Sequence, residues 1–423
     1  MNKHLRILIA ILLVAVMVLG VVGCTGEEEP VETDAPTETT APAGGDDNND
    51  DNNGGNNGGN QGGNQGGNQG GNQGGNQGGN QGGGNEDVVV VGDGIKLLGL
   101  RNANLGYEGG YWFDWAGSGI EMNINLTDGN VILGFETTGA DEDDIWFYVT
   151  VDGEAYGENG YAKIGCNMEE ESIILEGLAE GAHTIELVKV TDVKVASAHL
   201  TAIEFNGSFG AVPAEKDLVV EFVGDGLTTG QGLGENGDVT KAYAWAVAEA
   251  LTADYSIVAT EGATLKSALA DYTKASLRNT DIAYKFHRAA DVVVLNIGAE
   301  DYAIDQANTE NNAEAFQASY EALIAKVRTW NPEAKIICVY GAVAGYDAAI
   351  QAAAAAAGGE AKGVYTLALT AAAGAAPTEQ EQAAYATAIT EKINAVKDAQ
   401  FIVNTPVKGD GSVQDWANGV QNG

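Results

Sequence analysis

Residues 220–230 read V-E-F-V-G-D-G-L-T-T-G, an apolar run that stops at a glycine-rich turn. Nearly continuous apolar runs of this length are typical of strands in a parallel sheet that is covered on both faces. Five such runs occur in this half of the chain: Leu218–Val223, Tyr255–Ala259, Val292–Ile297, Ile336–Tyr340 and Val364–Leu369. We therefore predict a parallel sheet in which one strand ends at the turn after Val223.

Helical patterns lie between these runs. Apolar residues recur at helical spacing from Ala315 to Val327, and Asn331-Pro332 should end that helix. Residues 378–396 also read as a helix. Alternating strands and helices predict a doubly wound α/β domain over residues 213–423.

The preceding segment, residues 87–212, has a different pattern. Its short apolar runs are separated by turns of Gly, Asn and Asp. Several runs alternate, as Ile120, Met122, Ile124 and Leu126 do, which is the period of a half-buried strand. We predict an all-β sandwich for this segment.

Two motifs in the α/β segment resemble blocks of the SGNH, or GDSL-type, hydrolases. The turn Gly224-Asp225-Gly226-Leu227-Thr228 is similar to the family's G-D-S-hydrophobic-T block, which follows the first strand. Residues Gly298-Ala299-Glu300-Asp301 are similar to its G-x-N-D block. The resemblance implies a three-layer, flavodoxin-like SGNH domain.

The β segment adds a second resemblance. Residues 115–121, 151–153 and 181–192 are similar to the jelly-roll domain that precedes the hydrolase domain in carbohydrate esterase family 2. The family includes esterases of the acetylxylan-esterase type. The resemblance covers about residues 88–423 and implies a jelly roll followed by an SGNH domain.

The same resemblance indicates which reactive groups are missing. In a working member a serine attacks an ester carbonyl, a histidine takes its proton, and backbone N–H groups with an asparagine hold the oxyanion. Here Gly226 stands for the serine and Glu300 for the asparagine, while Gly262 keeps an N–H in the second block. Asp410 matches the aspartate of the C-terminal D-x-x-H, but no histidine follows His287. We expect these vestigial positions to include no catalytic residue.

Other assignments for this region are weaker. Thr228 and Thr229 should aim away from the nucleophile position, and Asp301 should brace its turn. The carboxylates of Asp225, Glu300 and Asp301 could cluster around a cation, but an acidic chain brings carboxylates together by chance. We expect neither a metal nor a cofactor.

Tryptophans are candidate ligand contacts, because an indole ring stacks on sugar rings. Trp112, Trp115 and Trp146 of the β segment could do so, or could pack in a core or a domain interface. Trp416 is favoured, since its segment should border the former active cleft. The predicted ligand-binding residues are Asp225, Gly226, Gly262, Glu300 and Trp416.

The N-terminus predicts a lipoprotein signal peptide over residues 1–23. Basic residues precede the apolar run Ile7–Val22, and Gly23-Cys24 follows, so Cys24 is the expected lipidation site. An ordinary signal peptide or a single membrane anchor is the alternative, although the run is short for a span of about 20 residues. Residues 24–86 are acidic and then repeat Asn-Gln-Gly-Gly, which predicts a disordered tether.

The net charge of the chain excludes some classes of binding partner. With 21 Lys and Arg against 60 Asp and Glu, the net charge is −39, which disfavours nucleic acid and anionic lipid surfaces. A neutral polysaccharide meets no such penalty. Cys166 and Cys338 show no framework spacing and should be buried thiols.

These expectations combine into one reading. The chain should be lipid-anchored on the extracellular face of a bacterial cytoplasmic membrane, catalytically inactive, and able to bind polysaccharide, such as acetylated xylan, in the vestigial cleft. Two alternatives stay open: an active O-acetyl esterase that deacetylates plant or cell-wall polysaccharide, and a surface scaffold that binds other proteins.

Overall fold

The computed structural model describes residues 88–89, 94–101, 110–138, 144–166, 170–234, 237–278, 282–286, 288–374 and 376–401. All of them fall in one compact unit of the chain, Gln81–Gly423. The predicted signal peptide, the lipidation site Cys24 and the tether lie outside these residues, as do Asp410 and Trp416. None of the helices in the described ranges is both long and apolar enough to cross a membrane.

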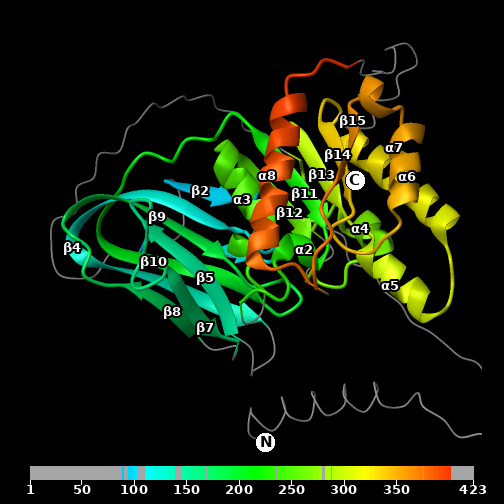
Figure 1. Cartoon of the computed structure of the whole chain (residues 1–423). Helices are drawn as coiled ribbons and strands as arrows, with labels where there is room; N and C mark the ends of the chain where they lie inside the picture. Colours follow the sequence, from blue (N-terminus) through cyan, green and yellow to red (C-terminus); the bar gives the residue numbers. More distant parts are fainter. Residues whose placement is uncertain are drawn as a thin grey trace, which may run out of the picture. The chain divides into compact units, whose positions relative to one another are not determined.

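The α/β part contains a parallel sheet of five strands in the order β12-β11-β13-β14-β15 (Figure 1). The strands are β11 (Val219–Gly224), β12 (Asp254–Ala259), β13 (Val292–Asn296), β14 (Lys335–Tyr340) and β15 (Val364–Ala368). Each apolar run identified in the sequence forms one of them. The parallel sheet is therefore confirmed, and its first strand ends at the turn quoted above.

Helices pack on both faces of this sheet. They are α2 (Gly226–Thr229), α3 (Tyr243–Leu251), α4 (Leu265–Asp271), α5 (Ala299–Ala307), α6 (Ala313–Trp330), α7 (Asp347–Ala356) and α8 (Glu379–Val396), with 3-10 turns η1 (Val239–Lys241) and η2 (Gly359–Lys362). Alternate residues of β13 enter two separate cores: Val294 packs with α3 and α8, and Val293 packs with α4, α6 and α7. The continuous apolar runs follow from this burial of both faces.

Local sequence sets the ends of the two helices predicted from spacing. Helix α6 stops at Trp330, directly before Asn331-Pro332. Helix α8 starts after Thr378, whose hydroxyl accepts a hydrogen bond from Glu381 N while the Glu381 side chain accepts one from Thr378 N. This reciprocal capping satisfies backbone donors that the first helical turn leaves free.

The β part forms an antiparallel, strand-rich sheet of ten described strands that curls around its own apolar core. They are β1 (Val88–Val89), β2 (Ile95–Leu98), β3 (Tyr111–Phe113), β4 (Gly119–Thr138), β5 (Asp144–Val151), β6 (Glu154–Ala155), β7 (Tyr161–Gly165), β8 (Glu170–Leu175), β9 (Gly181–Lys189) and β10 (Ser197–Phe209). The alternating residues from Ile120 to Leu126 are buried, as their period predicts. The jelly-roll connectivity of a two-sheet sandwich stays a prediction.

A buried arginine joins the two parts. Arg101, which follows β2, donates to Glu221 Oε2 on β11 at 2.8 Å and to Ser256 Oγ on β12 at 3.2 Å. The carbonyl oxygen of Tyr272 accepts another hydrogen bond, and the Tyr272 hydroxyl donates to Glu221 Oε1 at 2.6 Å. The rings of Tyr272, Tyr284 and Phe286 surround the guanidinium with centroids 4.5 to 5.1 Å from it.

A turn of the β part adds further contacts to this joint. Trp115 is 2% exposed and donates from its indole nitrogen to Ala275 O at 3.0 Å. Asp114 accepts hydrogen bonds from Ser276 Oγ and from Arg278 N. The domain-interface reading of Trp115 is therefore correct, and this residue is not available to a ligand.

Replacing Arg101 with methionine should lower the free energy of unfolding by about 3–5 kcal/mol, because the Glu221 carboxylate then stays buried without its partner. Chemical denaturation measures this change. The double variant Arg101→Met/Glu221→Met should lose clearly less than the sum of the two single losses. Additive losses would show that the two side chains are not coupled.

Candidate functional site

The first block of the site is a strand, a tight turn and one turn of helix. Strand β11 ends at Gly224, and Asp225 caps helix α2 by accepting a hydrogen bond from Leu227 N at 3.1 Å. Gly224 has no room for a side chain, since a Cβ there would lie 2.0 Å from Thr228 Oγ1 and 2.8 Å from Asn296 O. Gly226 is the first residue of α2, where a serine would face outward from the end of the strand.

The space at Gly226 is filled by another side chain. A Cβ placed on Gly226 would lie 2.0 Å from Gln231 Oε1 and 2.8 Å from Gln231 Cδ. The carboxamide of Gln231 therefore stands where a nucleophilic serine would begin. This contact could not be predicted from the motif, because Gln231 lies beyond the matched block and reaches back across the Gly230 turn.

All three blocks of the α/β part meet in one cavity of about 520 Å³. Four of the five predicted ligand-binding residues line it: Asp225, Gly226, Gly262 and Glu300. They meet because β12, β11 and β13 are neighbours in a parallel sheet, so that their carboxyl ends share one edge. Trp416 and Asp410 lie outside the described residues.

Several residues of this lining were not predicted from the sequence. Gln231, Tyr302 and Gln306 add polar groups, and short side chains after β14 and β15, including those of Ala342 and Ala372, leave the cavity open. Tyr302 and Gln306 are four residues apart on α5, on the helix face that also carries the lining residues Ala299 and Ala303, and this spacing could have identified them.

The lining lacks the groups of acyl-transfer chemistry. Within the described part of the chain, no Ser, Thr, Cys or His side chain lines the cavity. Thr228 and Thr229 are buried, and the Thr228 hydroxyl is hydrogen-bonded to the Tyr243 hydroxyl at 2.8 Å. They aim away from the cavity, as expected.

The described histidines belong to the β part. His183 contacts Asp152 Oδ2 at 2.7 Å and Ala179 O at 2.8 Å. His199 stacks on Trp112 with 4.6 Å between ring centroids. The contacts of both histidines are with residues of the β part, and neither lines the cavity. His287 lies outside the described residues.

Carboxylates dominate the electrostatics of the site. Burial raises the pKa of Asp225 to about 7, and the charges of Glu300 and Asp301 push it in the same direction. Burial also raises the pKa of Asp301, whose carboxylate accepts a hydrogen bond from Leu265 N at 2.9 Å. This bond fastens the start of α4, so Asp301 braces the site as expected. Glu261, which precedes Gly262 in the second block, forms an ion pair of 3.8 Å with Lys194 of the β part.

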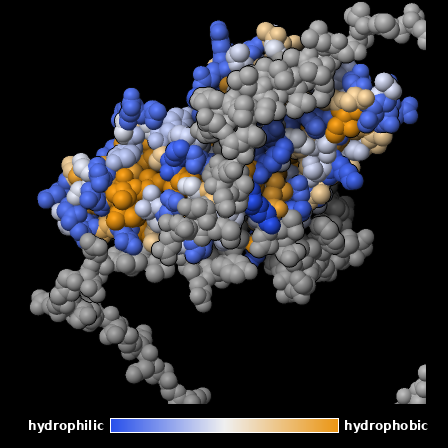
Figure 2. Space-filling view, turned by 90° about the horizontal axis from the view of Figure 1, so that it is seen from below, coloured by the Kyte–Doolittle hydropathy of each residue, from blue (hydrophilic) through white to orange (hydrophobic). Residues whose placement is uncertain are grey.

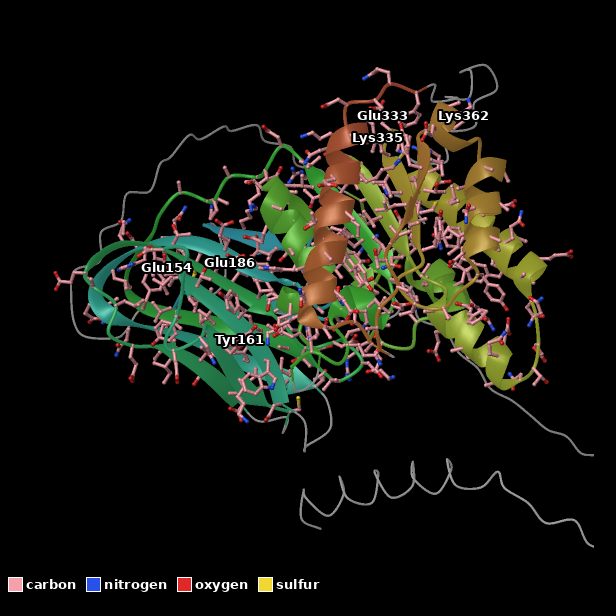
Figure 3. All side chains as sticks on the ribbon, viewed as in Figure 1. Glu154, Tyr161, Glu186, Glu333, Lys335 and Lys362 are labelled. Atoms are coloured by element: carbon pink, nitrogen blue, oxygen red, sulfur yellow. The ribbon has the colours of Figure 1, made fainter. Side chains whose placement is uncertain are left out.

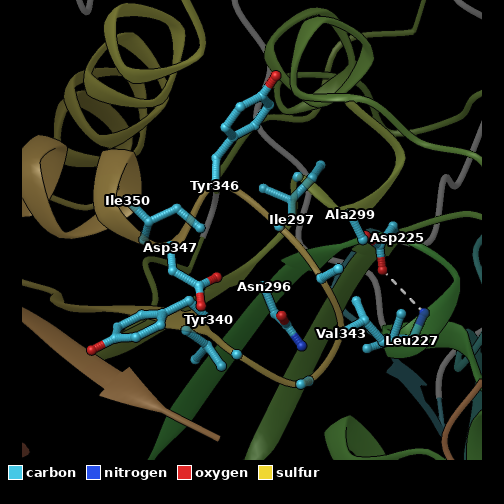
Figure 4. Close-up of a pocket in the computed structure, with 16 residues that line it drawn as sticks. Asp225, Leu227, Asn296, Ile297, Ala299, Tyr340, Val343, Tyr346, Asp347 and Ile350 are labelled. Carbon is cyan, nitrogen blue, oxygen red and sulfur yellow. Dashed lines mark hydrogen bonds between the residues drawn. The ribbon is translucent and has the colours of Figure 1, made fainter. Parts of the chain in front are cut away.

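A much smaller cavity lies beside the main one, between the loops after β13 and β14 (Figure 4). Asp225, Asn296, Val343 and Tyr346 are among its lining residues. Its volume of about 20 Å³ suits one water molecule, so it is too small for a sugar ring. The 520 Å³ cavity is therefore the candidate ligand site, and we call it the vestigial cleft.

The raised pKa of Asp225 predicts a pH-dependent stability. The folded state holds this proton more tightly than the unfolded chain, so the contribution is fully present below about pH 4 and is lost as the pH rises through about 7. Asp225→Asn keeps the capping acceptor but removes the titration. From pH 5 to pH 8 the wild type should therefore lose up to a few kcal/mol of unfolding free energy relative to this variant.

Denaturant titrations at the two pH values measure that difference. Glu154→Gln is a matched control, since it removes an exposed carboxylate of the β part. Parallel pH profiles for wild type and Asp225→Asn would contradict the assignment.

Comparisons with known proteins place this geometry in a family. Residues 222–417 match the GDSL-like Lipase/Acylhydrolase family. Cellulase/esterase CelE of Acetivibrio thermocellus is 26% identical over 248 residues, which are 54% of this chain and 29% of CelE. The chain thus spans less than a third of the length of this relative.

Solved structures share the fold of both parts. A family two carbohydrate esterase from Clostridium thermocellum, in complex with cellohexaose, has a TM-score of 0.63 at 23% identity, over 71% of this chain and 98% of its own. Another carbohydrate esterase, whose active site displays divergent catalytic and non-catalytic binding functions, has a TM-score of 0.57 at 17% identity, over 72% and 98%. The resemblance identified from the sequence is thereby confirmed: this chain carries a GDSL-like lipase/acylhydrolase domain and has, with its β part, the fold of the family two carbohydrate esterases.

Proposed function

We propose that this protein binds a neutral polysaccharide in the vestigial cleft without cleaving it. One observation carries the proposal: the cleft is open and lined by polar groups, yet the Gln231 carboxamide fills the nucleophile position at Gly226. A scaffold that keeps its cavity but fills the reactive position suits binding better than turnover.

The replaced groups account for inactivity. Removing a triad member from a serine hydrolase costs on the order of a million-fold in turnover. Here the serine position is glycine, and the oxyanion asparagine position is Glu300. A carboxylate beside a developing oxyanion raises the barrier that a neutral donor would lower.

The lining suits sugar hydroxyls. Gln231 and Gln306 offer both donors and acceptors, and Glu300 offers acceptors. The negative charge of the cleft and of the chain disfavours anionic polymers. Two facts about the relatives support the proposal: one binds cellohexaose, and another displays a non-catalytic binding function in its active site.

The proposal also includes attachment of the protein to a membrane through its N-terminus. A lipid on Cys24, the tether of residues 24–86 and a jelly-roll β domain would hold the cleft away from a bacterial membrane, where wall or plant polysaccharide is within reach. This part rests on the sequence patterns of the N-terminus. Radiolabelled palmitate incorporation that persists in Cys24→Ala would contradict it.

The full-length protein should release no acetate from acetylated xylan above the buffer rate. The variant Gly226→Ser should restore none, because no histidine that could take the serine proton lies among the described lining residues. Acetate assays on both proteins test this. Release by the unaltered protein above the buffer rate would instead support the active O-acetyl esterase, and release gained in Gly226→Ser would show that a working base is present.

Binding should depend on the cleft. The double variant Gln231→Ala/Glu300→Ala should weaken binding of cellohexaose or deacetylated xylan at least ten-fold, since it removes two side chains that would hydrogen-bond to hydroxyl groups of the sugar. Titration calorimetry measures the affinity. Gln317→Ala on α6, outside the cleft lining, is the control. If neither glycan binds the wild type, the proposal fails.

A further inference from the structure

A second cavity, of about 300 Å³, lies between the β part and the segment that leads into α3. Trp146 on β5 and Tyr161 on β7 line one side, and Asp238 and Lys241 at the ends of η1 line the other. It shares no lining residue with the vestigial cleft. Figure 3 labels Tyr161 in this region of the β part. We call it the aromatic pocket.

Strand alternation directs Trp146 into this pocket. Its neighbours Ile145 and Phe147 are fully buried in the β core, so the Trp146 side chain lies on the opposite face of the sheet. Trp146 belongs to none of the apolar cores of the described residues. Its indole nitrogen also has no hydrogen-bond partner among them. The Lys163 ammonium lies 5.4 Å from the centroid of the Trp146 ring, so a cation–π contact, rather than packing in an apolar core, forms part of the surroundings of this tryptophan.

Hydrogen bonds and ring packing hold the two walls of the aromatic pocket together. The Tyr161 hydroxyl donates to Asp238 Oδ2 at 2.8 Å, and the Tyr148 ring packs edge-on against Tyr161 with 5.3 Å between centroids. Asp238 in turn accepts a hydrogen bond from Thr240 N at 3.0 Å. The pocket is thus preformed, and a ligand would lose little of its binding free energy to ordering side chains.

At the pocket Lys241 compensates the carboxylate of Asp238, and it also contacts Glu379, which does not line the pocket. Lys241 Nζ lies 3.7 Å from Asp238 Oδ2 and 3.3 Å from Glu379 Oε1. The exposed Asn159 adds a neutral amide at the rim. An indole face beside an amide and a compensated ion pair fits a ligand with one apolar face and uncharged hydroxyls.

A pyranose ring has those properties, and its volume fits a pocket of this size. Figure 2 shows that hydrophobic residues also gather on the β part on the face it displays. We propose that the aromatic pocket binds one pyranose residue of a neutral glycan, with its C–H face on Trp146 and its hydroxyls toward the exposed amide of Asn159.

Titration of the full-length protein with cellohexaose and with xylohexaose tests this site, with calorimetry and tryptophan fluorescence as readouts. In the Gln231→Ala/Glu300→Ala background, where the vestigial cleft is disabled, binding of at least one glycan should remain. Adding Trp146→Ala should weaken that remaining binding at least ten-fold. Trp146→Phe, which keeps an aromatic face, should weaken it less.

Asn159→Ala serves as a second variant at an exposed position; it removes the rim amide together with the acceptor of a 3.1 Å hydrogen bond from Tyr161 N, and it should weaken binding several-fold. Asn130→Ala, an exposed asparagine that does not line the pocket, is the matched control.

The outcomes separate the two sites. Binding that is insensitive to Trp146→Ala and to Asn159→Ala, or that vanishes entirely in the cleft double variant, overturns the aromatic pocket and leaves the vestigial cleft as the binding site. Binding that survives the cleft variant but falls with Trp146→Ala supports the pocket even where the cleft proposal fails.

Discussion

The ion pair between Arg101 and Glu221 is the constraint on which the rest of the molecule depends. Glu221 lies in the middle of β11, the strand that ends at the vestigial cleft, and its carboxylate is buried. A buried carboxylate is tolerated only with a partner of opposite charge and with its lone pairs satisfied. Arg101 of the β part and the Tyr272 hydroxyl supply both. The β part is therefore required to complete the core of the α/β part.

That constraint positions the cleft independently of any chemistry within it. Strand β11 is fixed at its middle, so Gly224 and Asp225 are held at the sheet edge whether or not a nucleophile follows. The reactive positions could then change without loss of the fold. Gln231 occupies the serine position, and Glu300 adds a charge that helps to keep Asp225 partly protonated near neutral pH.

Much of this could be predicted from the sequence. The five parallel strands and helices α6 and α8 follow from apolar runs, helical spacing and the caps at Thr378 and Asn331. The convergence of Asp225 and Glu300 follows from family blocks at strand ends. Gln231 could not be foreseen, because a side chain that folds back over a glycine leaves no periodic trace. The aromatic pocket was equally hidden, since Tyr161 and Asp238 meet only through the packing of one part on the other.

We propose that the cleft, as the described residues line it, retains its walls while lacking a serine, threonine or cysteine nucleophile and a histidine base. A crystal structure of the full-length protein grown with cellohexaose tests it most directly. We expect an intact oligosaccharide in the cleft, with the Gln231 carboxamide at the Gly226 position and Glu300 within hydrogen-bond distance of sugar hydroxyls. A serine, threonine or cysteine side chain within hydrogen-bond distance of an imidazole at this sheet edge would contradict it.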